Sequence, residues 1–417
     1  MARSSLLKQG SAGLAGLAAG RTRYLRAMAA AGRLAALYAR HYRDPDAVHA
    51  RGADMLARMC RQNGATWVKA AQFFSCRPDV LPADYILAFQ TLQNDAQPVP
   101  FHRIEHALKK AWGADWRDQL RHIDSEPVAV ASIAQVHRAT LADGRQVAIK
   151  VRLPGVKRLF EQDEKVFEAM ASLLAPLVRE FDLRQAVQQL LQMTATELDM
   201  RNEASNMQRF ARLQHHPRIR VPELVKSLSG ERVLVTGWEE GERLRPYLDA
   251  HPEQAQELLT LLLTSYLQQV TRFGVYQADP HPGNFLVNRD GQVVILDYGA
   301  IGILSPDEVR RYSRLLYGLM GFEGDVDIGE LFVQAGFKGG SPDTLRELAL
   351  YVLTDRLNQQ GPMAAMANLM DRFRESRISI PDSYIGISRV LITLGGFLMT
   401  YQVPFDWTPP ERRPARP

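Results

Sequence analysis

The sequence predicts an α+β protein in which a small β-rich lobe packs on a larger helical lobe, with a cleft between the two. Short β-branched runs occur in two places, from Pro127 and from Phe285, and turn dipeptides join them. Long helical stretches separate these places and continue to the C-terminus. The 417-residue chain is 46% hydrophobic and 23% charged, which is typical of a folded protein and excludes a disordered one.

The N-terminal arm, residues 1–45, is strongly basic. Its first 43 residues carry eight Arg or Lys and no Asp or Glu, so the total charge of +5 leaves −3 for the rest of the chain. An Ala/Leu helix with regularly spaced arginines could bind an anionic membrane surface. The alternatives are a solvated basic helix and a disordered lead-in. The arginines concerned are Arg21, Arg26, Arg33 and Arg40.

Targeting and redox signals are few. The arm lacks a compact apolar core followed by a cleavage site, so no secretory signal is predicted. Cys60 and Cys76 fit neither a disulfide framework nor a metal-ligand spacing, which indicates reduced thiols. The apolar stretch Val390–Pro404 is too short and too interrupted by Gly to span a bilayer. We therefore expect a cytoplasmic protein without a transmembrane helix, with peripheral attachment to the inner membrane as an alternative, and no nucleic-acid partner.

The remaining elements follow in order. Residues 50–121 are mostly helical, and strands 128–141 and 146–153 then form a hairpin at Asp143-Gly144. Helices cover 156–213 with a break near Phe181. Two strand-like runs, 220–228 and 231–238, meet at Ser229-Gly230. A helix from 252 to 273 precedes a second hairpin, 285–288 with 292–299, which turns at Asp290-Gly291, and helices complete the chain.

The most specific chemical signal lies around the second hairpin. Asn284 follows Asp279 by five residues, and Asp297 comes thirteen residues later, at the end of an apolar strand. Phosphoryl transfer uses this set: one carboxylate near the attacking group, and an amide oxygen with a second carboxylate for Mg²⁺. Each signal alone is weak, because Asp-Pro is usually a turn. Together they match the two catalytic signatures of protein kinases, with Tyr298 in place of the usual Phe.

The first hairpin supports this interpretation. Its second strand carries the lysine of VAIK, Lys150, where a kinase lysine would grip the α- and β-phosphates, although a lone lysine there is usually only a strand-end charge. The helix with ELDMRNEASN offers Glu197, Asp199 and Glu203 as carboxylate partners. Because Glu197 and Glu203 do not share one narrow helix face, they would serve different partners. Residues 128–136 contain no glycine, so an alanine-rich loop replaces the usual Gly-rich loop.

Six ordered blocks of the chain resemble the UbiB/AarF family of atypical kinase-like proteins. The blocks are WVKAAQFFSCRPDVLP, AVASIAQVH, ADGRQVAIKVRLPGV, ELDMRNEASN, DPHPGNFLV and LDYGA. The resemblance implies a bilobal protein-kinase-like fold with a helical N-terminal extension, and ATP and Mg²⁺ as cofactors. It divides the chain into the arm (1–45), the extension (46–125), an N-lobe (126–240) and a mostly helical C-lobe (241–410).

The resemblance also implies residue roles. Lys150 would grip the phosphates with Glu203 as its partner, Asn284 and Asp297 would bind Mg²⁺, and Asp279 would occupy the catalytic-base position. Nucleotide contacts would come from the alanine-rich loop and from the hinge 235–241: Ala129, Ala131, Ser132, Ala134, Trp238 and Glu239. The extension would lie over the active site through Lys69 and Gln72, held there by Glu197 and Asp199, and would exclude protein substrates.

The expected function is an Mg-ATP-dependent atypical kinase or ATPase that supports ubiquinone biosynthesis, with quinone-pathway enzymes or lipid intermediates as partners. One alternative is a non-catalytic, ATP-switched module that binds lipid or protein, and another is a small-molecule phosphotransferase. Two family glycines are replaced, by Ala71 and Ala134. If either position needs a positive φ, nucleotide handling would change.

Overall fold

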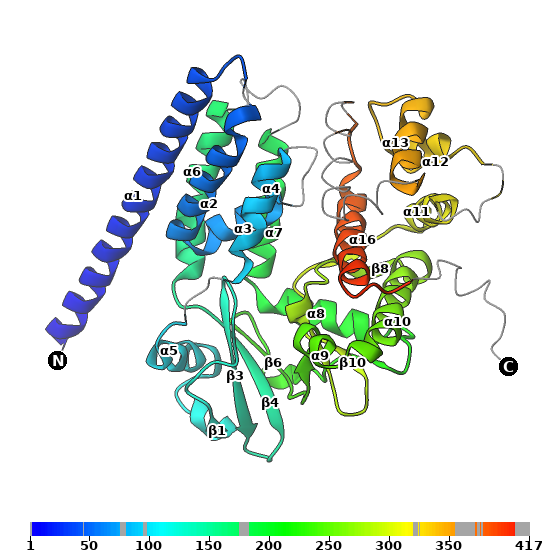
Figure 1. The fold of residues 1–417 in the computed structure, drawn as a ribbon. Coiled ribbons are helices and arrows are strands. Elements are labelled where there is room, and N and C mark those ends of the chain that lie inside the picture. The colour runs from blue at the N-terminus through cyan, green and yellow to red at the C-terminus, as the bar shows by residue number, and fades with distance from the viewer. Residues whose placement is uncertain are drawn as a thin grey trace. The chain divides into compact units, whose positions relative to one another are not determined.

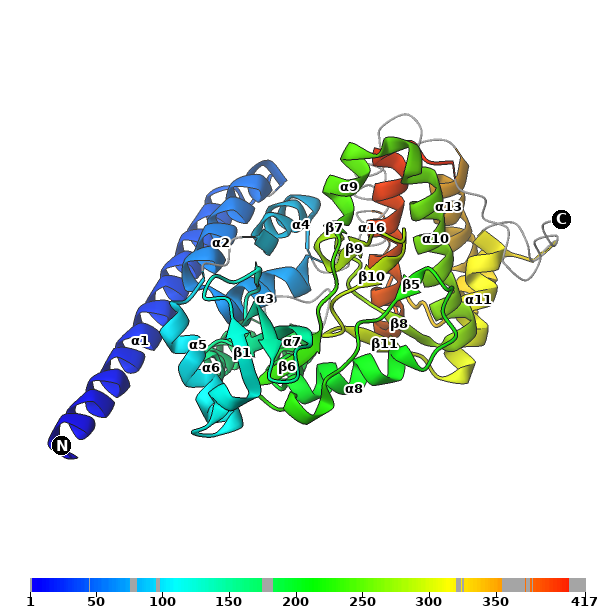
Figure 2. The same ribbon diagram turned by 90° about the horizontal axis from the view of Figure 1, so that it is seen from below.

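The computed structural model describes residues 2–44, 46–75, 81–94, 98–174, 183–319, 324, 326–354, 372, 376 and 378–404. The chain divides into two compact units, shown in Figures 1 and 2. The first unit comprises Met1–Met200 and Leu228–Val235, and the second comprises Arg201–Ser227 and Thr236–Pro417. The expected break near Phe181 and the predicted thiol Cys76 lie outside the described residues.

The first unit joins a helical bundle to a sheet. Its helices are α1 (Ala2–Arg40), α2 (His49–Asn63), α3 (Ala65–Phe74), α4 (Ala83–Gln90), α5 (Phe101–Trp112), α6 (Val156–Leu174) and α7 (Leu183–Glu197), with 3-10 turns Asp46–Val48, Thr91–Asn94 and Trp116–Gln119. In Figure 1, α1 runs alongside α2 and α6, and these helices share one apolar core with α3, α4 and α7. The extension is therefore part of the same compact unit as the sheet.

The sheet confirms the first predicted hairpin, but the predicted first strand, 128–141, is two strands that pair with each other. Its strands are β1 (Leu120–Ile123), β2 (Ala129–Val130), β3 (Ala134–Leu141), β4 (Gln146–Arg152) and β6 (Val233–Gly237), in the order β1-β3-β4-β6, with β2 paired to β3. β3 and β4 are antiparallel, in a register that sets Val136 opposite Lys150. Gly144 supplies the positive φ of +94° that the connecting turn requires.

The second unit is mostly helical and contains two small sheets. Its helices are α8 (Met200–Ala211), α9 (Leu244–Ala250), α10 (Ala255–Gln268), α11 (Pro306–Leu319), α12 (Ile328–Gln334), α13 (Pro342–Thr354) and α16 (Asp382–Thr400), with short turns Lys226–Leu228, Pro252–Gln254 and Pro282–Asn284 and a π-helical turn Gln269–Phe273. One sheet has the order β5-β10-β9-β7, from Ile219–Arg220, Val293–Ile295, Phe285–Val287 and Glu242–Arg243. The other pairs β8 (Val275–Gln277) with β11 (Ile301–Ile303).

The second predicted hairpin is confirmed, and the predicted pair of runs before it is confirmed only in part. β9 and β10 are antiparallel, with Val287 opposite Val293. The run 220–228 meets β6 through a single antiparallel bridge, Leu224 with Thr236, and does not form a continuous strand beside it. Its first residue is in β5, which pairs in parallel with β10. Pro222 has no N–H to give to a ladder, which explains why this run leaves the sheet after two residues.

Helix α16 begins eight residues before the apolar stretch seen in the sequence. Within the described parts of the chain it is the one helix long and apolar enough to cross a membrane, with a mean hydropathy of 1.3 over a window that is 35% buried. A core helix of a soluble protein passes the same test, so this is weak evidence. Its residues Tyr384, Ile387 and Val390 are buried in the main apolar core of the second unit, beside α10 (Figure 2).

Candidate active site

Two loops of the second unit carry the predicted catalytic and metal-binding residues, and strand pairing brings them together. Residues 278–284 connect β8 to β9, and residues 296–300 connect β10 to β11. Because β8 pairs with β11 and β9 with β10, both loops leave their strands at the same end. Backbone hydrogen bonds join the loops directly, from Ala278 N–H to the Ala300 carbonyl (2.9 Å) and from Leu296 N–H to the Asn284 carbonyl (2.9 Å).

The strand pair depends on one close approach. Gly302 lies opposite Tyr276, and a Cβ at position 302 would come within 2.1 Å of the Tyr276 ring. Any larger residue would therefore displace either the buried Tyr276 ring or β11 itself.

The loop after β8 is cross-linked by its own side chains. Asn284 Nδ2 donates to the Asp279 carbonyl (3.0 Å), and His281 Nδ1 accepts from Gly283 N–H (3.1 Å). Arg243 donates from Nη1 to the Gly283 carbonyl. Burial lowers the pKa of His281, and its acceptor role at Nδ1 also requires the neutral ring. The loop is thus held in one conformation by side chains as well as by its ends.

The carboxylate of Asp279 forms an ion pair with Arg389 of α16, with 2.7 Å between Arg389 Nη2 and Asp279 Oδ1. Both side chains are partly exposed, at 25% and 33%. Arg389 therefore belongs to the candidate site, although nothing near it in the sequence signals this.

The oxygen ligands of Asn284 and Asp297 fit the chemistry of Mg²⁺. Since Asn284 gives its amide N–H to the Asp279 carbonyl, its Oδ1 remains as the acceptor, and it makes no hydrogen bond within the described part of the chain. Asp297 Oδ1 accepts from Gly299 N–H (2.8 Å), which fixes the orientation of the carboxylate. The described residues contain no cluster of three or more His, Cys, Asp or Glu side chains suited to a metal. An Mg²⁺ ion held here would complete its shell with phosphate and water oxygens.

A buried glutamine, Gln277, lies directly behind these loops. Its side chain is hydrogen-bonded to the backbone of both Asp279 and Asp297 and to the hydroxyl of Tyr266. It is fully buried, with 0% exposure. No motif in the sequence marks Gln277, and the available signal is a polar side chain at the end of a short strand, two residues before Asp279.

Two further predicted residues are buried in the second unit. Glu203 lies in the first turn of α8 and is 6% exposed. Tyr298, the residue in place of the usual Phe, is 1% exposed and packs on Phe210, with 5.2 Å between ring centroids. Asn206 Nδ2 donates to the Tyr298 carbonyl (3.0 Å), so α8 is tied to the loop that carries Asp297.

The first unit holds Lys150 and the alanine-rich loop. Lys150 lies on the face of β4 opposite the buried Ile149 and Val151, and is itself half-buried. The turn between β2 and β3 is tight, since Ala131 N–H donates to the Ala134 carbonyl (2.8 Å). Ala129 is in β2 and Ser132 in this turn.

The comparisons with known proteins identify the family. Residues 91–326 match the family described as the ABC1 atypical kinase-like domain. The chain belongs to the ABC1 (UbiB/AarF) family of atypical kinase-like proteins. The predicted α+β, kinase-like fold is thereby confirmed.

Named relatives of this ABC1-family chain include proteins from bacteria, plants and animals. The uncharacterized protein slr0889 of Synechocystis is 29% identical, over 72% of this chain and 78% of its own length. The chloroplastic "ACTIVITY OF BC1 COMPLEX KINASE 1" of Arabidopsis thaliana is 29% identical over 72% of this chain, and mouse "AarF domain-containing protein kinase 1" is 29% identical over 66%. The matches span 45% of the Arabidopsis protein and 54% of the mouse protein, so this chain covers about half the length of each.

A solved structure with this fold is the complex of Rv3197 with erythromycin from Mycobacterium tuberculosis. Its TM-score is 0.59 at 26% sequence identity, and the match covers 80% of this chain and 87% of that one.

The two alanines that replace family glycines lie in ordinary backbone conformations in this ABC1-family protein. Ala71 is within α3 and Ala134 is the first residue of β3, and both are buried. Among the described residues, Gln402 is the one non-glycine residue with positive φ. Neither alanine position therefore needs the conformational freedom of glycine.

Gln135 and His137, from the same block as Ala134, have structural roles. Gln135 Oε1 accepts from Val99 N–H (2.6 Å), and its Nε2 faces His137 Nε2 (3.3 Å). His137 Nδ1 contacts the Asp124 carbonyl (2.8 Å). Both side chains are fully buried, and burial lowers the pKa of His137. They fasten the segments at Val99 and Asp124 to the edge of β3.

The structure brings two of the predicted extension residues together. Lys69 of α3 and Glu197 of α7 form an ion pair at 2.7 Å, partly shielded from solvent. Gln72 is one turn further along α3, and Asp199 is in the short break between α7 and α8. That break is anchored by the buried Arg152, which donates to the Leu198 carbonyl and to Glu231.

The hinge residues Trp238 and Glu239 follow β6. Both are half-buried, and Glu239 accepts from Arg220 Nε at 2.7 Å. This bond holds the Glu239 carboxylate beside Arg220, the last residue of β5.

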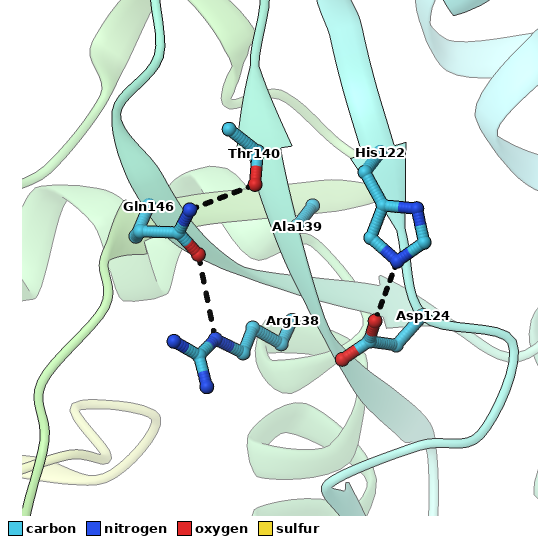
Figure 3. A pocket seen from close by; sticks show the side chains of 6 residues that line it. All are labelled: His122, Asp124, Arg138, Ala139, Thr140 and Gln146. Atoms are coloured by element: carbon cyan, nitrogen blue, oxygen red, sulfur yellow. Dashed lines mark hydrogen bonds and ion pairs between the residues drawn. The ribbon is translucent and has the colours of Figure 1, made fainter.

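A separate polar pocket of about 260 Å³ lies on the sheet of the first unit (Figure 3). Its polar groups pair with one another: His122 with Asp124 at 2.8 Å, and Gln146 with Thr140 at 2.8 Å and with Arg138 at 3.4 Å. The pocket includes none of the predicted site residues, so it does not bear on the kinase-like chemistry.

Proposed function

We propose that this protein binds Mg-ATP and acts as an atypical kinase or ATPase. The observation that carries the proposal is the pair of cross-linked loops in the second unit, which holds Asp279, Asn284 and Asp297 in fixed positions. Positioning and electrostatic stabilisation are most of what a phosphoryl-transfer enzyme must supply. Such an enzyme needs these three side chains together and held in place.

Each residue then has a role. Asn284 Oδ1 and the Asp297 carboxylate would hold Mg²⁺, which neutralises charge on the phosphates when it is bound. Lys150 would grip the phosphates, with the buried Glu203 as its carboxylate partner. Asp279 would orient the attacking oxygen and accept its proton. Contacts to the nucleotide would come from Ala129, Ala131, Ser132 and Ala134 and from the backbone at Trp238 and Glu239.

We further propose a small or lipid-like acceptor, or water, in place of a protein. The Lys69–Glu197 ion pair makes α3 a rigid part of its unit, which supports a fixed role for the extension, with Gln72 and Asp199 beside it, in excluding peptide substrates. Family membership supports a role in the biosynthesis of ubiquinone or a related isoprenoid quinone, by analogy alone. The partners would then be quinone-pathway enzymes or lipid intermediates, at the inner face of a membrane or in the cytoplasm.

Thermal unfolding with and without Mg-ATP tests nucleotide binding, because a ligand that binds only the folded state stabilises it. We expect Mg-ATP to raise Tm. Asp297→Asn keeps an oxygen for Gly299 N–H but removes the charge, so it should abolish the Mg²⁺-dependent part of the shift. Lys150→Ala should abolish most of the shift. The matched control, Asp290→Asn in the exposed β9–β10 turn, should behave like the wild type. An unchanged shift in both site variants would refute the assignment.

One observation favours the second candidate, an ATP-switched module that binds a membrane. α1 exposes Tyr24, Leu25 and Met28 on one side, and Arg26 and Arg33 form no ion pair with any described acidic residue. Apolar side chains flanked by free cations suit an anionic bilayer surface. Phosphate release measured with and without anionic liposomes separates the candidates: nucleotide binding without turnover in either condition supports the module and rules out the enzyme.

A further inference from the structure

We propose that Gln277 is a positioning residue that couples the loop of Asp279 to the loop of Asp297, so that the catalytic-base and metal-binding residues move as one piece. The proposal deepens the proposed function and rests on it for its kinetic consequences. Its structural basis is independent of that function, because it depends only on hydrogen bonds within the second unit.

The side-chain amide of Gln277 uses its full hydrogen-bonding capacity. Oε1 accepts from Tyr266 O–H (2.7 Å) and from Asp279 N–H (2.9 Å). Nε2 donates to the carbonyl of Asp279 (2.8 Å) and to the carbonyl of Asp297 (3.3 Å). A primary amide offers two donors and two acceptor lone pairs, and all four are used here. The Nε2 group is thus a direct bridge between the two loops.

Few other side chains could make this bridge. A carboxylate would accept from Tyr266 and Asp279 but would face the two carbonyls with no donor. An apolar side chain would leave three groups without the partner they have here, the Tyr266 O–H, the Asp279 N–H and the Asp297 carbonyl, each at a substantial cost in free energy. The Asp279 carbonyl would keep Asn284 Nδ2 as a donor. A neutral histidine has one donor and one acceptor, and so could satisfy only half of the set.

The bridge is anchored on the buried end of α10. Gln277 N–H donates to Gln269 Oε1 (3.0 Å), and Gln269 Nε2 donates to Ser265 Oγ (3.3 Å). Gln269, Gln277, Ser265 and Tyr266 are all at most 4% exposed. Gln269 also begins the π-helical turn that ends α10, and such turns occur frequently at functional sites. A shift of either loop would therefore have to disturb a fully satisfied network in the core.

Hydrogen exchange tests the coupling without any nucleotide. In Gln277→Leu we expect peptides covering 275–287 and peptides covering 293–304 both to exchange faster, with the rest of the second unit unchanged. The matched control, Gln254→Glu, removes an amide that binds Tyr247 outside the loops and should leave both regions unchanged. Faster exchange in the first region alone would overturn the coupling, whatever the outcome of the Mg-ATP measurements.

Kinetics of Gln277→Glu give a readout that a purely structural role would not move. The new carboxylate can accept from the Tyr266 O–H and the Asp279 N–H, but it has no donor for the Asp279 and Asp297 carbonyls, so the bridge to the second loop is lost. We expect kcat about tenfold to a hundredfold below wild type, a raised Mg²⁺ requirement, and a KM for ATP close to that of the wild type. A wild-type Mg²⁺ requirement, or a loss confined to the KM for ATP, would contradict the positioning role.

The two proposals fail in different ways. If the wild-type protein shows no Mg-ATP shift while both loops respond in Gln277→Leu, the proposed function is wrong and the coupling stands. If Mg-ATP binds and is turned over while Gln277→Leu and Gln277→Glu retain wild-type Mg²⁺ dependence, the positioning role is wrong and the proposed function stands.

Discussion

Arg389 pairs with Asp279 across 110 residues of sequence, with 2.7 Å between Arg389 Nη2 and Asp279 Oδ1. Arg389 is in α16, whose buried residues Ile387 and Val390 fix the helix in the apolar core. The orientation of the carboxylate at the catalytic-base position is therefore set by a helix far beyond the matched domain, which ends at residue 326.

Arg389→Met should leave Asp279 without this constraint. We expect kcat for phosphate release to fall by about tenfold, which corresponds to about 1.4 kcal/mol of activation barrier, with KM for ATP nearly unchanged. Arg389→Lys retains the charge and one donor and should keep most of the activity. A change in KM with kcat intact would show that Arg389 binds nucleotide and does not position Asp279.

The sequence indicates the predicted catalytic residues but not what holds their loops. Asp279, Asn284 and Asp297 follow one another at fixed spacings on a local hairpin, so their pattern predicts their proximity. Arg389 acts through the folded arrangement, and no local spacing links it to Asp279. Gln277 is only two residues from Asp279, but its contacts with Asp297 and Tyr266 depend on tertiary structure. A long-range partner of this kind becomes visible only when α16 and the buried end of α10 are placed.

The fold shows the same contrast between local features, which the sequence predicts, and long-range pairings, which it does not. The hairpins at Gly144 and Gly291 are local, and their turn dipeptides predict them. The run 220–228 has strand composition, yet a single bridge, Leu224 with Thr236, joins it to β6, and its first residue pairs in parallel with the distant β10. A parallel pairing leaves no turn signal in the sequence. Composition predicted a strand there, whereas the pairing depended on tertiary structure.

The buried ion pair between Arg23 and Asp163 should make α1 essential to the first unit. Asp163 also accepts from Trp67 Nε1 (3.2 Å), and both members of the pair are under 10% exposed. Arg23→Met would leave a buried carboxylate without its cation, which costs about 3–5 kcal/mol of unfolding free energy. Denaturant unfolding measures this loss.

The double variant Arg23→Met/Asp163→Leu serves as the comparison. It removes both charges and leaves only Trp67 Nε1 without an acceptor, so we expect it to be more stable than Arg23→Met alone. Arg33→Met, on the exposed side of the same helix, should change stability by less than about 0.5 kcal/mol. Equal, small effects for Arg23 and Arg33 would mean that α1 does not pack on α6 in solution.

Stability should decrease at acidic pH because of His137. Its Nδ1 faces a carbonyl and its Nε2 faces the Gln135 amide nitrogen, so the neutral ring satisfies both contacts while the protonated ring does not. Burial lowers the pKa below the ordinary value of 6.5. Above pH 6.5 the ring is neutral in both states and the contribution is fully present. As pH falls through that value, the unfolded chain takes up a proton that the folded chain does not, and unfolding becomes easier.

Unfolding free energies measured from pH 8 to pH 5 check this expectation. His215 and His281 have lowered pKa values for the same reason, so His137→Gln should reduce the slope without removing it. A slope in His137→Gln equal to that of the wild type would show that the ring takes up its proton equally in the folded and unfolded chain.

Tyr298→Phe should stabilise the protein or leave it unchanged. The Tyr298 hydroxyl is buried and has no hydrogen-bond partner among the described residues, whereas its ring packs on Phe210. Phe keeps the ring and removes a desolvated polar group, so we expect a gain of up to about 1 kcal/mol in denaturant unfolding. Tyr266→Phe is the matched contrast: its hydroxyl donates to Gln277, and its loss should cost about 1–2 kcal/mol. If Tyr298→Phe is instead the more destabilising variant, a buried water or ligand atom must satisfy the Tyr298 hydroxyl, and the loop that carries Asp297 would depend on that group.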